Sequence, residues 1–553
     1  MIHSATNGKP SAGPRVWRIC FWCLVAALFV LAAWQRFALP LDPIADPDTW
    51  GYLAPALRSL LGAEFGHTYG RNFVYPGFVL WLLRGFGDFR AIVIAQHLLG
   101  LMAGGILLLT WRRARALVRH AKLGHEIHGG LGLILTAIFL FSGEQILFEI
   151  ELRPEGVAAF LIGLTLYLSL QFIICCFLEK RAAATVGFGI GTVFSVLLLV
   201  SAKPSFRFVA AVTLLPIAIF FFRHGWFRQK MALAIGGLSC AVVLLLPEYY
   251  LSRDDEATRT FLPTQLFVMH ADLIRDQLAD DLQRGAKTPY PRELLDRVHH
   301  ELVIELGRSI ESHPVHFRSL GFCPDYLMYE PGSINAKLRD TFETSDSRSA
   351  FYRYCYLRIW RERPWQVIRR IGRQMALFYA RTCPAYKRDR FLNLTSGYQD
   401  GITSLNVQPY PELWMSYPPA VLYFNRTELL GRSAPSIHQA APLRLVLSLL
   451  ARLYRPLLLI TIVGGVVCFL RRRCRDALSW LAAWVASLYL WNLACCLEVA
   501  IIHSLDVPRY NTIQMLFTML AQFSAFWFLC EIALELWTVV ANPARGRFHT
   551  QEV

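Results

Sequence analysis

The sequence predicts an all-α polytopic membrane protein, on three observations. Of its 553 residues, 55% are hydrophobic and only 17% are charged, and the mean hydropathy is +0.37. These values are far from those of a soluble enzyme of this length. Apolar runs of about 20 residues, enough to cross the hydrocarbon core of a bilayer, recur along the chain. About ten can be marked, at residues 17–38, 90–111, 129–148, 156–178, 184–202, 206–222, 231–247, 454–470, 477–498 and 511–536.

Basic residues between these runs predict the orientation. Lys and Arg in short loops are retained on the cytoplasmic side, whereas acidic residues count for little. Arginine-rich loops follow the second, sixth and eighth runs, and all of them fall inside if the N-terminus is cytoplasmic. Residues 1–16 and 537–553 are then expected to be cytoplasmic tails, and the first run is too long for a cleaved signal peptide. The net charge of +16 therefore needs no nucleic-acid partner.

Two sizeable pieces remain outside the runs, and both are expected on the extracytoplasmic side. They are a first outer loop, residues 39–89, and a long outer segment, residues 248–453. The transmembrane part is thereby divided into an N-terminal module, residues 17–247, with about seven helices, and a C-terminal set, residues 454–536. Function is expected in the two outer pieces.

The first outer loop opens with an acidic stretch, Asp42-Pro-Ile-Ala-Asp46-Pro-Asp48-Thr-Trp-Gly-Tyr52. From Trp50 to Leu61 the apolar positions recur at helical spacing, which predicts an amphipathic helix at the membrane interface. Gly and Pro residues then break the helix, and residues 78–86 are too short to span the membrane. We expect a second interfacial helix there.

The first outer loop has a recognisable arrangement of residues. An acid lies just outside the first run, an aromatic residue follows four positions later, and an Arg and a Tyr-Pro pair come before the second run. Asp48, Tyr52, Arg71 and the pair Tyr75-Pro76 match it. The sequence resembles the GT-C glycosyltransferases, a superfamily that includes bacterial aminoarabinose transferases and protein O-mannosyltransferases. Many members carry a second acid directly after the first, where this chain has Thr49. Asp46 is then expected to stand in for that acid.

The resemblance implies a GT-C-like bundle and a hexosyl- or pentosyltransferase. The donor sugar would be carried on a polyprenyl phosphate or diphosphate, and it would pass with inversion to a glycan, lipid or protein acceptor at the extracytoplasmic face. An inverting transfer needs one general base, and Asp48 is the candidate, with Asp46 as the second carboxylate. A carboxylate beside an apolar interface is expected to have a raised pKa. The alternative is that Asp48 only caps the following helix.

Other site residues are expected at the outer ends of the runs. GT-C enzymes also carry an acid near the start of the fourth run. By this resemblance Glu155 would orient the substrate, with Glu149 as the second candidate. The alternative is that Glu155 only caps the helix that follows. Phosphate on the donor needs cations. Lys203 and the pair Arg509-Tyr510 are the candidates, the pair resembling a feature near the final runs of related transferases. Tyr52 and Arg71 complete the predicted substrate-binding set.

The long outer segment is expected to be mostly helical. Residues 253–310 alternate charged and apolar positions at helical spacing, which predicts soluble helices over the site. Residues 351–381 place aromatic and apolar residues every three or four positions among arginines, which predicts an amphipathic helix at the interface. Residues 383–440 are rich in Pro, Tyr, Ser and Asn and are expected to form an irregular loop.

Cysteine spacing predicts no metal site, and no metal ligand is assigned. Cys323, Cys355 and Cys383 lie in the outer segment. One disulfide between two of them is compatible with the sequence, which does not say which two would pair. Paired acids could hold a divalent cation, so a cation cofactor is also left open. Two Asn-x-Thr sequons, at Asn393 and Asn425, would be modified only in a eukaryotic lumen. The expected location is the bacterial inner membrane rather than the endoplasmic reticulum.

Three other classes of function compete with the transferase. A transporter or flippase for lipid-linked sugars would place charges inside the runs and show symmetric halves, which the sequence lacks. An O-antigen polymerase or ligase would depend on Arg and His in the outer segment, and His270, His313 and His316 keep it open. A non-catalytic scaffold leaves the acidic first loop unexplained.

Overall fold

The computed structural model describes residues 13–66, 71–312, 317–406 and 415–541, so most of the two expected tails lies outside the description. Among the described residues, nine helices are long and apolar enough to cross a membrane. They contain α1 (Gly13–Phe37), α4 (Arg90–Ala114), α7 (Glu155–Ile173), α8 (Ala182–Ala202), α9 (Arg207–Phe222), α10 (Phe227–Arg253), α21 (Ala441–Leu470), α22 (Arg472–Ile502) and α24 (Met515–Ala541). The all-α, multi-pass prediction is confirmed.

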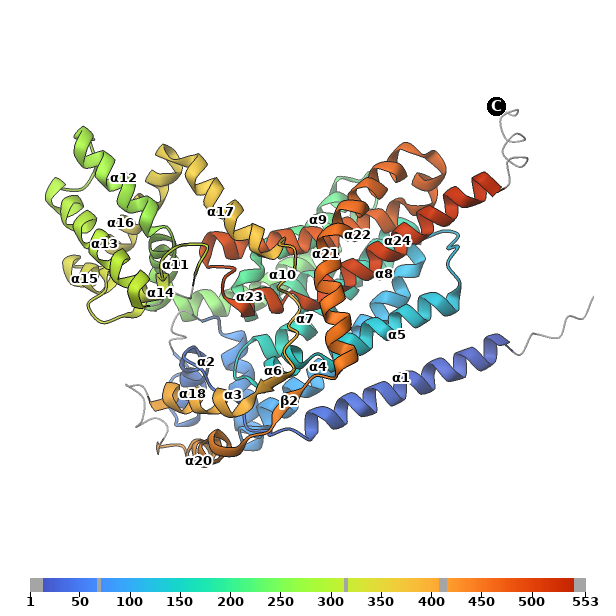
Figure 1. Ribbon diagram of the computed structural model, residues 1–553, viewed down its shortest axis with the longest axis horizontal. Helices are drawn as coiled ribbons and strands as arrows, with labels where there is room; N and C mark the ends of the chain where they lie inside the picture. The colour runs from blue at the N-terminus through green and yellow to red at the C-terminus, as the bar shows by residue number, and fades with distance from the viewer. Residues whose placement is uncertain (1–12, 67–70, 313–316, 407–414, 542–553) are drawn as a thin grey trace, which may run out of the picture.

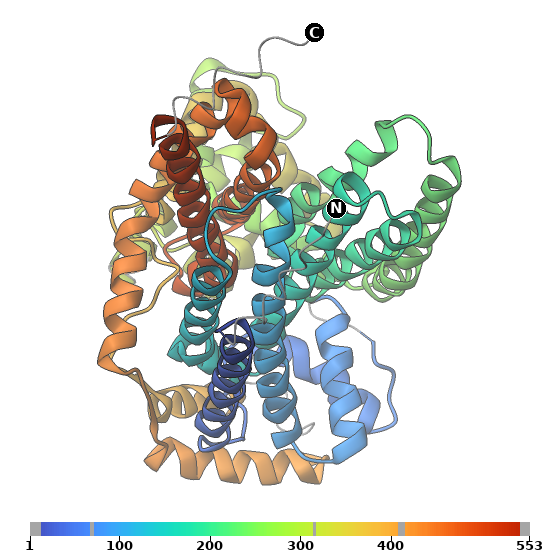
Figure 2. The same ribbon diagram turned by 90° about the vertical axis from the view of Figure 1, so that its right-hand side faces the viewer.

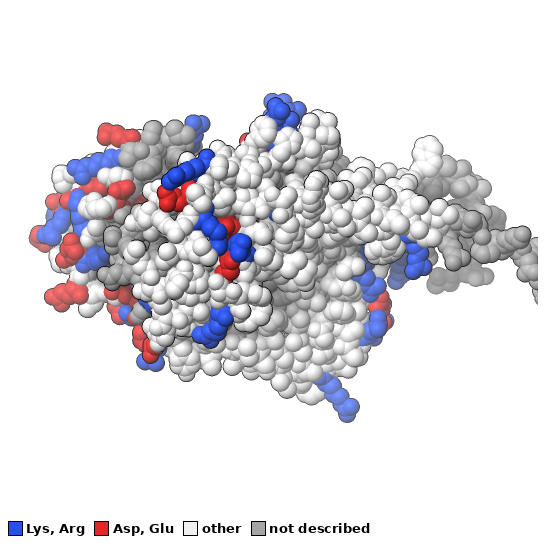
Figure 3. Space-filling model, turned by 90° about the horizontal axis from the view of Figure 1, so that it is seen from below, with Lys and Arg blue, Asp and Glu red and all other residues white. Residues whose placement is uncertain are grey.

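The bundle separates two ends of the molecule. α1 begins and α24 ends at one end, while the helices of the long outer segment gather at the other (Figure 1). Charged side chains concentrate toward the two ends, and a wide band between them is nearly free of charge (Figure 3). Such a band is typical of the surface that a hydrocarbon core covers.

The third predicted run is not one straight helix. It is divided into α5 (His125–Phe141) and α6 (Gly143–Ile150), whose axes differ by 47°. Ser142 has an extended backbone between them. A Cβ on Gly143 would come within 2.9 Å of the Leu392 side chain, so glycine lets another segment press against the bend. Tertiary packing, which residue periodicity does not report, explains the difference.

The first outer loop forms two helices, as predicted. α2 (Thr49–Leu60) packs against α3 (Val74–Phe86), which begins earlier than expected. Leu53 and Leu57 of α2 are fully buried, so its apolar face is covered. Short elements η1 (Arg115–Leu117), η2 (Ile174–Leu178), η3 (Pro204–Phe206) and α23 (Pro508–Thr512) connect spanning helices elsewhere in the chain.

The expectation of an irregular loop over residues 383–440 is wrong. The segment contains β1 (Phe391–Asn393), α18 (Leu394–Asn406), α20 (Pro418–Ser433) and β2 (Ser436–His438), and the two strands pair antiparallel. The hydroxyls of Tyr398 and Tyr423 donate to the carbonyls of Asp42 and Pro43, each at 2.6 Å. Contacts with the first outer loop therefore order a segment whose composition is that of a loop.

The described residues of 256–378 form a helical lobe at one end of the bundle, as predicted for their first part (Figure 1), and the lobe lies behind the spanning helices in Figure 2. Its helices are α11 (Glu256–Met269), α12 (Ala271–Arg284), α13 (Arg292–Ser312), α14 (Pro324–Tyr329), α15 (Ile334–Thr341), α16 (Ser345–Glu362) and α17 (Pro364–Phe378). The single amphipathic helix expected over residues 351–381 is two helices, because Pro364 begins a new one. Cys323, Cys355 and Cys383 are all buried free thiols.

A buried charge cluster ties α1, α4 and α6 together. The Glu149 carboxylate accepts hydrogen bonds from Arg36 Nε at 2.7 Å and Arg36 Nη2 at 3.0 Å, and it lies 2.9 Å from His97 Nδ1. All three side chains are fully buried. A buried charge of this kind is costly without its partner.

We expect Glu149→Gln to destabilise the protein by about 3–5 kcal/mol, because it leaves the Arg36 guanidinium buried without a counter-charge. Thermal unfolding of the purified protein in detergent measures the effect. The double variant Arg36→Met/Glu149→Gln removes both charges and should recover part of the loss. A Glu149→Gln variant that unfolds like the wild type would contradict the assignment.

Candidate active site

A cavity of about 400 Å³ lies where the first outer loop, the lobe and the spanning helices meet. Its lining comes from segments far apart in the sequence, among them the residues before α2 and the connection between α22 and α23. Every predicted site residue lines it except Asp46 and Glu149; those that do are Asp48, Tyr52, Arg71, Glu155, Lys203, Arg509 and Tyr510. The fold therefore brings most of the predicted set to one place.

Asp48 lies between two arginines. Its Oδ1 accepts a hydrogen bond from Arg71 Nη2 at 2.5 Å, and its Oδ2 accepts one from Arg509 Nη1 at 2.8 Å. Asp48 precedes the first residue of α2, but its side chain makes no capping hydrogen bond. The capping alternative is therefore wrong, and the carboxylate is held at the cavity by charge.

The expected rise in the pKa of Asp48 is wrong for this arrangement. Burial does favour a raised pKa, because it penalises the charged carboxylate. The positive charges of Arg71 and Arg509 outweigh burial, and they hold the pKa of Asp48 well below its usual range. Asp48 becomes a better proton acceptor only if these arginines turn to another anion.

Asp46 does not line the cavity, and a short strand-like contact holds the chain just before it. Ile44 pairs with Glu151 in an isolated parallel bridge, which lays the acidic stretch along residues 150–152. The Asp46 carboxylate forms an ion pair with Arg153, and its Oδ1 accepts from the Thr49 hydroxyl at 2.9 Å. Thr49 thus binds Asp46 instead of supplying a second acid.

A second ion pair lines the cavity beside the first. Lys203 Nζ donates to Glu155 Oε1 at 2.6 Å, and the same ammonium lies 5.4 Å from the centre of the Tyr510 ring. The guanidinium carbon of Arg71 is 5.2 Å from the centre of the Tyr52 ring. Aromatic faces stabilise cations in such positions. The two tyrosines therefore help to hold the basic side chains in place.

Glu149 does not line the cavity, although substrate orientation was predicted for it. Its carboxylate is occupied by Arg36 and His97 in the buried cluster of α1, α4 and α6. The Glu149 carbonyl accepts a hydrogen bond from Gln96 Nε2, which also donates to the Glu151 carbonyl and so fixes the end of α6 against α4. The geometry gives Glu149 a structural role.

No protein-family model matches the sequence, and no curated protein matches it either. Among solved structures, the chain is similar to ArnT from Cupriavidus metallidurans in the apo state. The identity is 11% and the TM-score is 0.31, over 89% of this chain and 78% of that chain.

Arg153 and His503 are among the cavity residues that sequence reasoning missed. Arg153 directly precedes Pro154 and Glu155, and its place beside a predicted site acid was the available signal. His503 follows α22 and stacks on Tyr510, with 5.0 Å between ring centres. Burial, with the charge of Arg509, lowers the pKa of His503 to about 3, so the imidazole is neutral.

Of the three histidines expected of a polymerase or ligase, only His270 lies in the described part of the chain, and it does not line this cavity. His270 is buried in the lobe, where its Nδ1 lies 3.1 Å from the Leu266 carbonyl. His313 and His316 lie outside the described residues. Among the described residues, no group of three or more His, Cys, Asp and Glu side chains is placed to hold a metal ion. The acids Asp46 and Asp48 face arginines.

Glu151 has the opposite environment to Asp48. Burial, with the negative charges of Glu155 and Glu144, raises its pKa to about 8. Arg153 lies 3.7 Å away, but its charge is already matched by Asp46. The folded protein therefore keeps a proton on Glu151 that the unfolded chain loses above its ordinary pKa near 4.5.

This raised pKa predicts a pH dependence of stability. Between about pH 5 and 8 the folded state binds more protons than the unfolded state, so the free energy of unfolding should fall as pH rises. One such proton contributes at most about 1.4 kcal/mol per pH unit. Thermal unfolding at several pH values should show a shallower fall for Glu151→Gln, and the exposed control Glu293→Gln should behave like the wild type. Equal slopes in all three proteins would contradict the assignment.

Proposed function

We propose that this protein is a membrane glycosyltransferase of GT-C type, which moves a sugar from a polyprenyl-phosphate or diphosphate donor to an acceptor hydroxyl. The observation that carries the proposal is the placement of Asp48 between Arg71 and Arg509 at a cavity beside the spanning helices. One carboxylate and several cations are what an inverting transfer from a phosphate requires. The pattern of the first outer loop supports the same chemistry.

In this proposal, donor binding releases the Asp48 carboxylate from its two arginines so that it can act as the base. The donor phosphate is an anion that competes with Asp48 for the guanidinium groups of Arg71 and Arg509. Once they turn to the phosphate, the pKa of Asp48 rises toward a value at which it can take a proton. The arrangement keeps the carboxylate inactive until the donor is in place.

The transfer is a single displacement. Asp48 takes the proton of the acceptor hydroxyl as that oxygen attacks the anomeric carbon, and the bond from this carbon to the phosphate oxygen breaks with its electron pair going to the phosphate. Arg71, Arg509 and Lys203 stabilise the charge on the leaving phosphate. Glu155 holds Lys203 at 2.6 Å and thereby positions that cation.

The proposed place of the reaction is the extracytoplasmic face; the location of the cavity, at the end of the bundle opposite the start of α1 and the end of α24, supports it. Arginine-rich loops at the end where those helices begin and finish favour a cytoplasmic location for that end. The proposed host membrane is the bacterial inner membrane, with both termini cytoplasmic. The acceptor is a glycan, lipid or protein.

A donor screen tests the function. Purified protein would be incubated with a panel of polyprenyl-phosphate sugars and simple acceptors, and release of the lipid phosphate would be measured. We expect turnover with at least one donor, and product with an inverted anomeric centre by NMR. Transport of an intact lipid-linked sugar across vesicles without release of phosphate would favour a flippase and contradict the proposal.

A further inference from the structure

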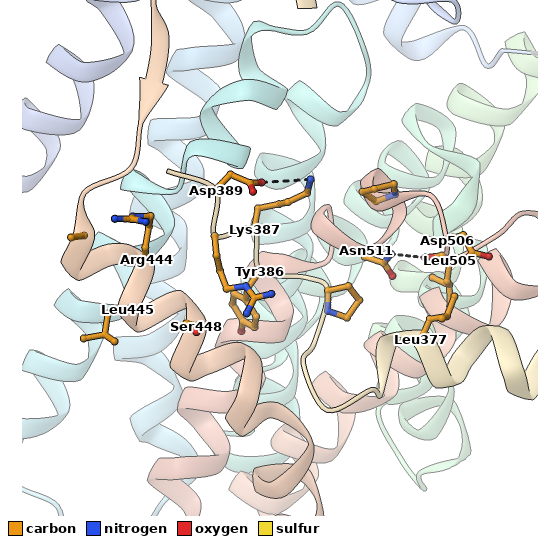
Figure 4. A pocket seen from close by; sticks show the side chains of 14 residues that line it. Leu377, Tyr386, Lys387, Asp389, Arg444, Leu445, Ser448, Leu505, Asp506 and Asn511 are labelled. Atoms are coloured by element: carbon orange, nitrogen blue, oxygen red, sulfur yellow. Dashed lines mark hydrogen bonds and ion pairs between the residues drawn. The ribbon is translucent and has the colours of Figure 1, made fainter. Parts of the chain in front are cut away.

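A second, larger hollow of about 840 Å³ lies on the other side of the connection between α22 and α23. Its walls are the end of α17, the chain from Pro384 to Asp389, the first two turns of α21, and Leu505, Asp506, Pro508 and Asn511. Figure 4 shows Lys387, Arg444 and Asn511 around this hollow. None of the predicted site residues lines it.

Cations outnumber acids in this hollow. Lys387, Arg388 and Arg444 line it, and the only ion pair that the structure shows among its described lining residues is Lys387 with Asp389, at 3.9 Å. The other lining acid, Asp506, accepts hydrogen bonds from the hydroxyls of Ser319 and Ser504, which do not neutralise a carboxylate, so three cations face two acids. The excess positive charge favours an anionic ligand.

Two polar atoms in the wall have no partner. Arg444 Nε is buried without a hydrogen bond. Asn511 is 2% exposed, and its Oδ1 has no partner while its Nδ2 donates to the Leu505 carbonyl at 2.7 Å. α21 also begins at Ala441 without a side-chain cap, and the start of a long helix attracts anions. A ligand with charged oxygens and attached hydroxyls would satisfy both atoms.

The hollow opens onto a lipid-facing stripe. Leu445, Leu449 and Leu453 recur every four residues on α21 and are 72%, 53% and 44% exposed, so they form one uncovered apolar track that starts in the hollow. The whole of α21, from Ala441 to Leu470, is long and apolar enough to cross a membrane. The hollow at its start therefore lies beside an apolar surface that an acyl chain can cover.

One short segment separates this hollow from the candidate active site. Leu505, Pro508 and Asn511 face the second hollow, whereas Arg509 and Tyr510 face the first. A molecule in the second hollow is therefore kept from Asp48 by the chain itself. It would instead stabilise the short segment between the two hollows and so help to fix the position of Arg509.

We propose that the second hollow binds the phosphate headgroup of an anionic membrane phospholipid, and that this lipid supports the segment carrying Arg509. Lys387 and Arg444 bind the phosphate, Asn511 accepts a hydrogen bond from a headgroup hydroxyl, and an acyl chain follows the leucine track of α21. The ligand is bound and not consumed. The binding claim does not depend on the proposed transferase activity.

Native mass spectrometry of the full-length protein, titrated with dioleoyl phosphatidylglycerol, tests the proposal. We expect a tight adduct whose affinity falls about fivefold in Lys387→Gln and about 30-fold in Lys387→Gln/Arg444→Gln, since each cation near an anionic headgroup contributes about fivefold. Arg432→Gln, an exposed arginine on α20, is the matched control and should bind like the wild type. Because Lys387 is partly exposed, its single variant is expected to fold even if the double variant does not.

Competing ligands separate the sources of phosphate. Dioleoyl phosphatidylcholine, which has no net charge, should bind more weakly, and inorganic phosphate should not displace the phospholipid. Phosphatidylglycerol should also slow hydrogen exchange in residues 503–512 of the wild type but not of Lys387→Gln/Arg444→Gln. Unchanged lipid affinity in both variants, or displacement by inorganic phosphate alone, would overturn the proposal whether or not the protein transfers sugar.

Discussion

Asp48→Asn is expected to lower the rate of sugar transfer about 10³-fold, because a positioned general base contributes on the order of 10²–10⁴-fold and the amide cannot take the proton. The change keeps the size of the side chain, so α2 and the spanning helices should fold and insert normally. Phosphate release from the best donor in the screen measures the loss. Size-exclusion chromatography and thermal unfolding check the fold.

Donor binding distinguishes a base from a structural residue in this variant. In the proposed mechanism the donor phosphate competes with the Asp48 carboxylate for Arg71 and Arg509, and the amide would remove that competition. Asp48→Asn should therefore bind the donor as tightly as the wild type or more tightly while failing to transfer the sugar. The exposed control Asp400→Asn on α18 should keep full activity. Full activity of Asp48→Asn would remove Asp48 as the base.

Arg509→Gln is expected to weaken binding of the donor by about 10–100-fold. A hydrogen bond to a charged group contributes about 1.5–3 kcal/mol. The same change also removes a positive charge that would stabilise the leaving phosphate. The KM for the donor should rise, and kcat should fall as well. Arg71 would still hold Asp48 at 2.5 Å, so the carboxylate should remain at the cavity.

A matched arginine makes this test specific. Arg84→Gln on α3 changes the same side chain in the same way, but the Arg84 guanidinium donates to Ser59 at 3.3 Å on an exposed face. It should leave the donor KM unchanged. An Arg509→Gln variant with an unchanged donor KM would show that Arg509 does not bind the donor phosphate.

Local pattern was a good guide to the elements and a partial guide to the cavity. The helical periodicity from Trp50 to Leu61 predicted α2, and the long apolar runs predicted the spanning helices, because each pattern is set by which face of a helix meets lipid or protein. The position of Asp48 relative to Tyr52 and Arg71 could also be read locally. These residues are close in sequence, so the first outer loop alone brings them together.

Pairing across long separations was not available from local pattern. Arg509 and Asp48 are 461 positions apart, and no periodicity says that a residue before the last helix meets the first outer loop. The environment of Asp48 was therefore misjudged, since an apolar interface raises a carboxyl pKa and two arginines lower it. Glu149 shows the reverse case. Its acid looked free in the sequence, yet the fold pairs it with Arg36.

The amino-acid order is enough to say that this is a helical, multi-pass membrane protein and that an acid after the first span is chemically notable. Hydrophobicity and charge act residue by residue, so composition and spacing report them directly. The tertiary structure decided the rest: which acid faces which arginine, that Thr49 binds Asp46, and that residues 505–511 divide two hollows. Those features depend on the close approach of distant segments, where charges and hydrogen bonds act over a few ångströms.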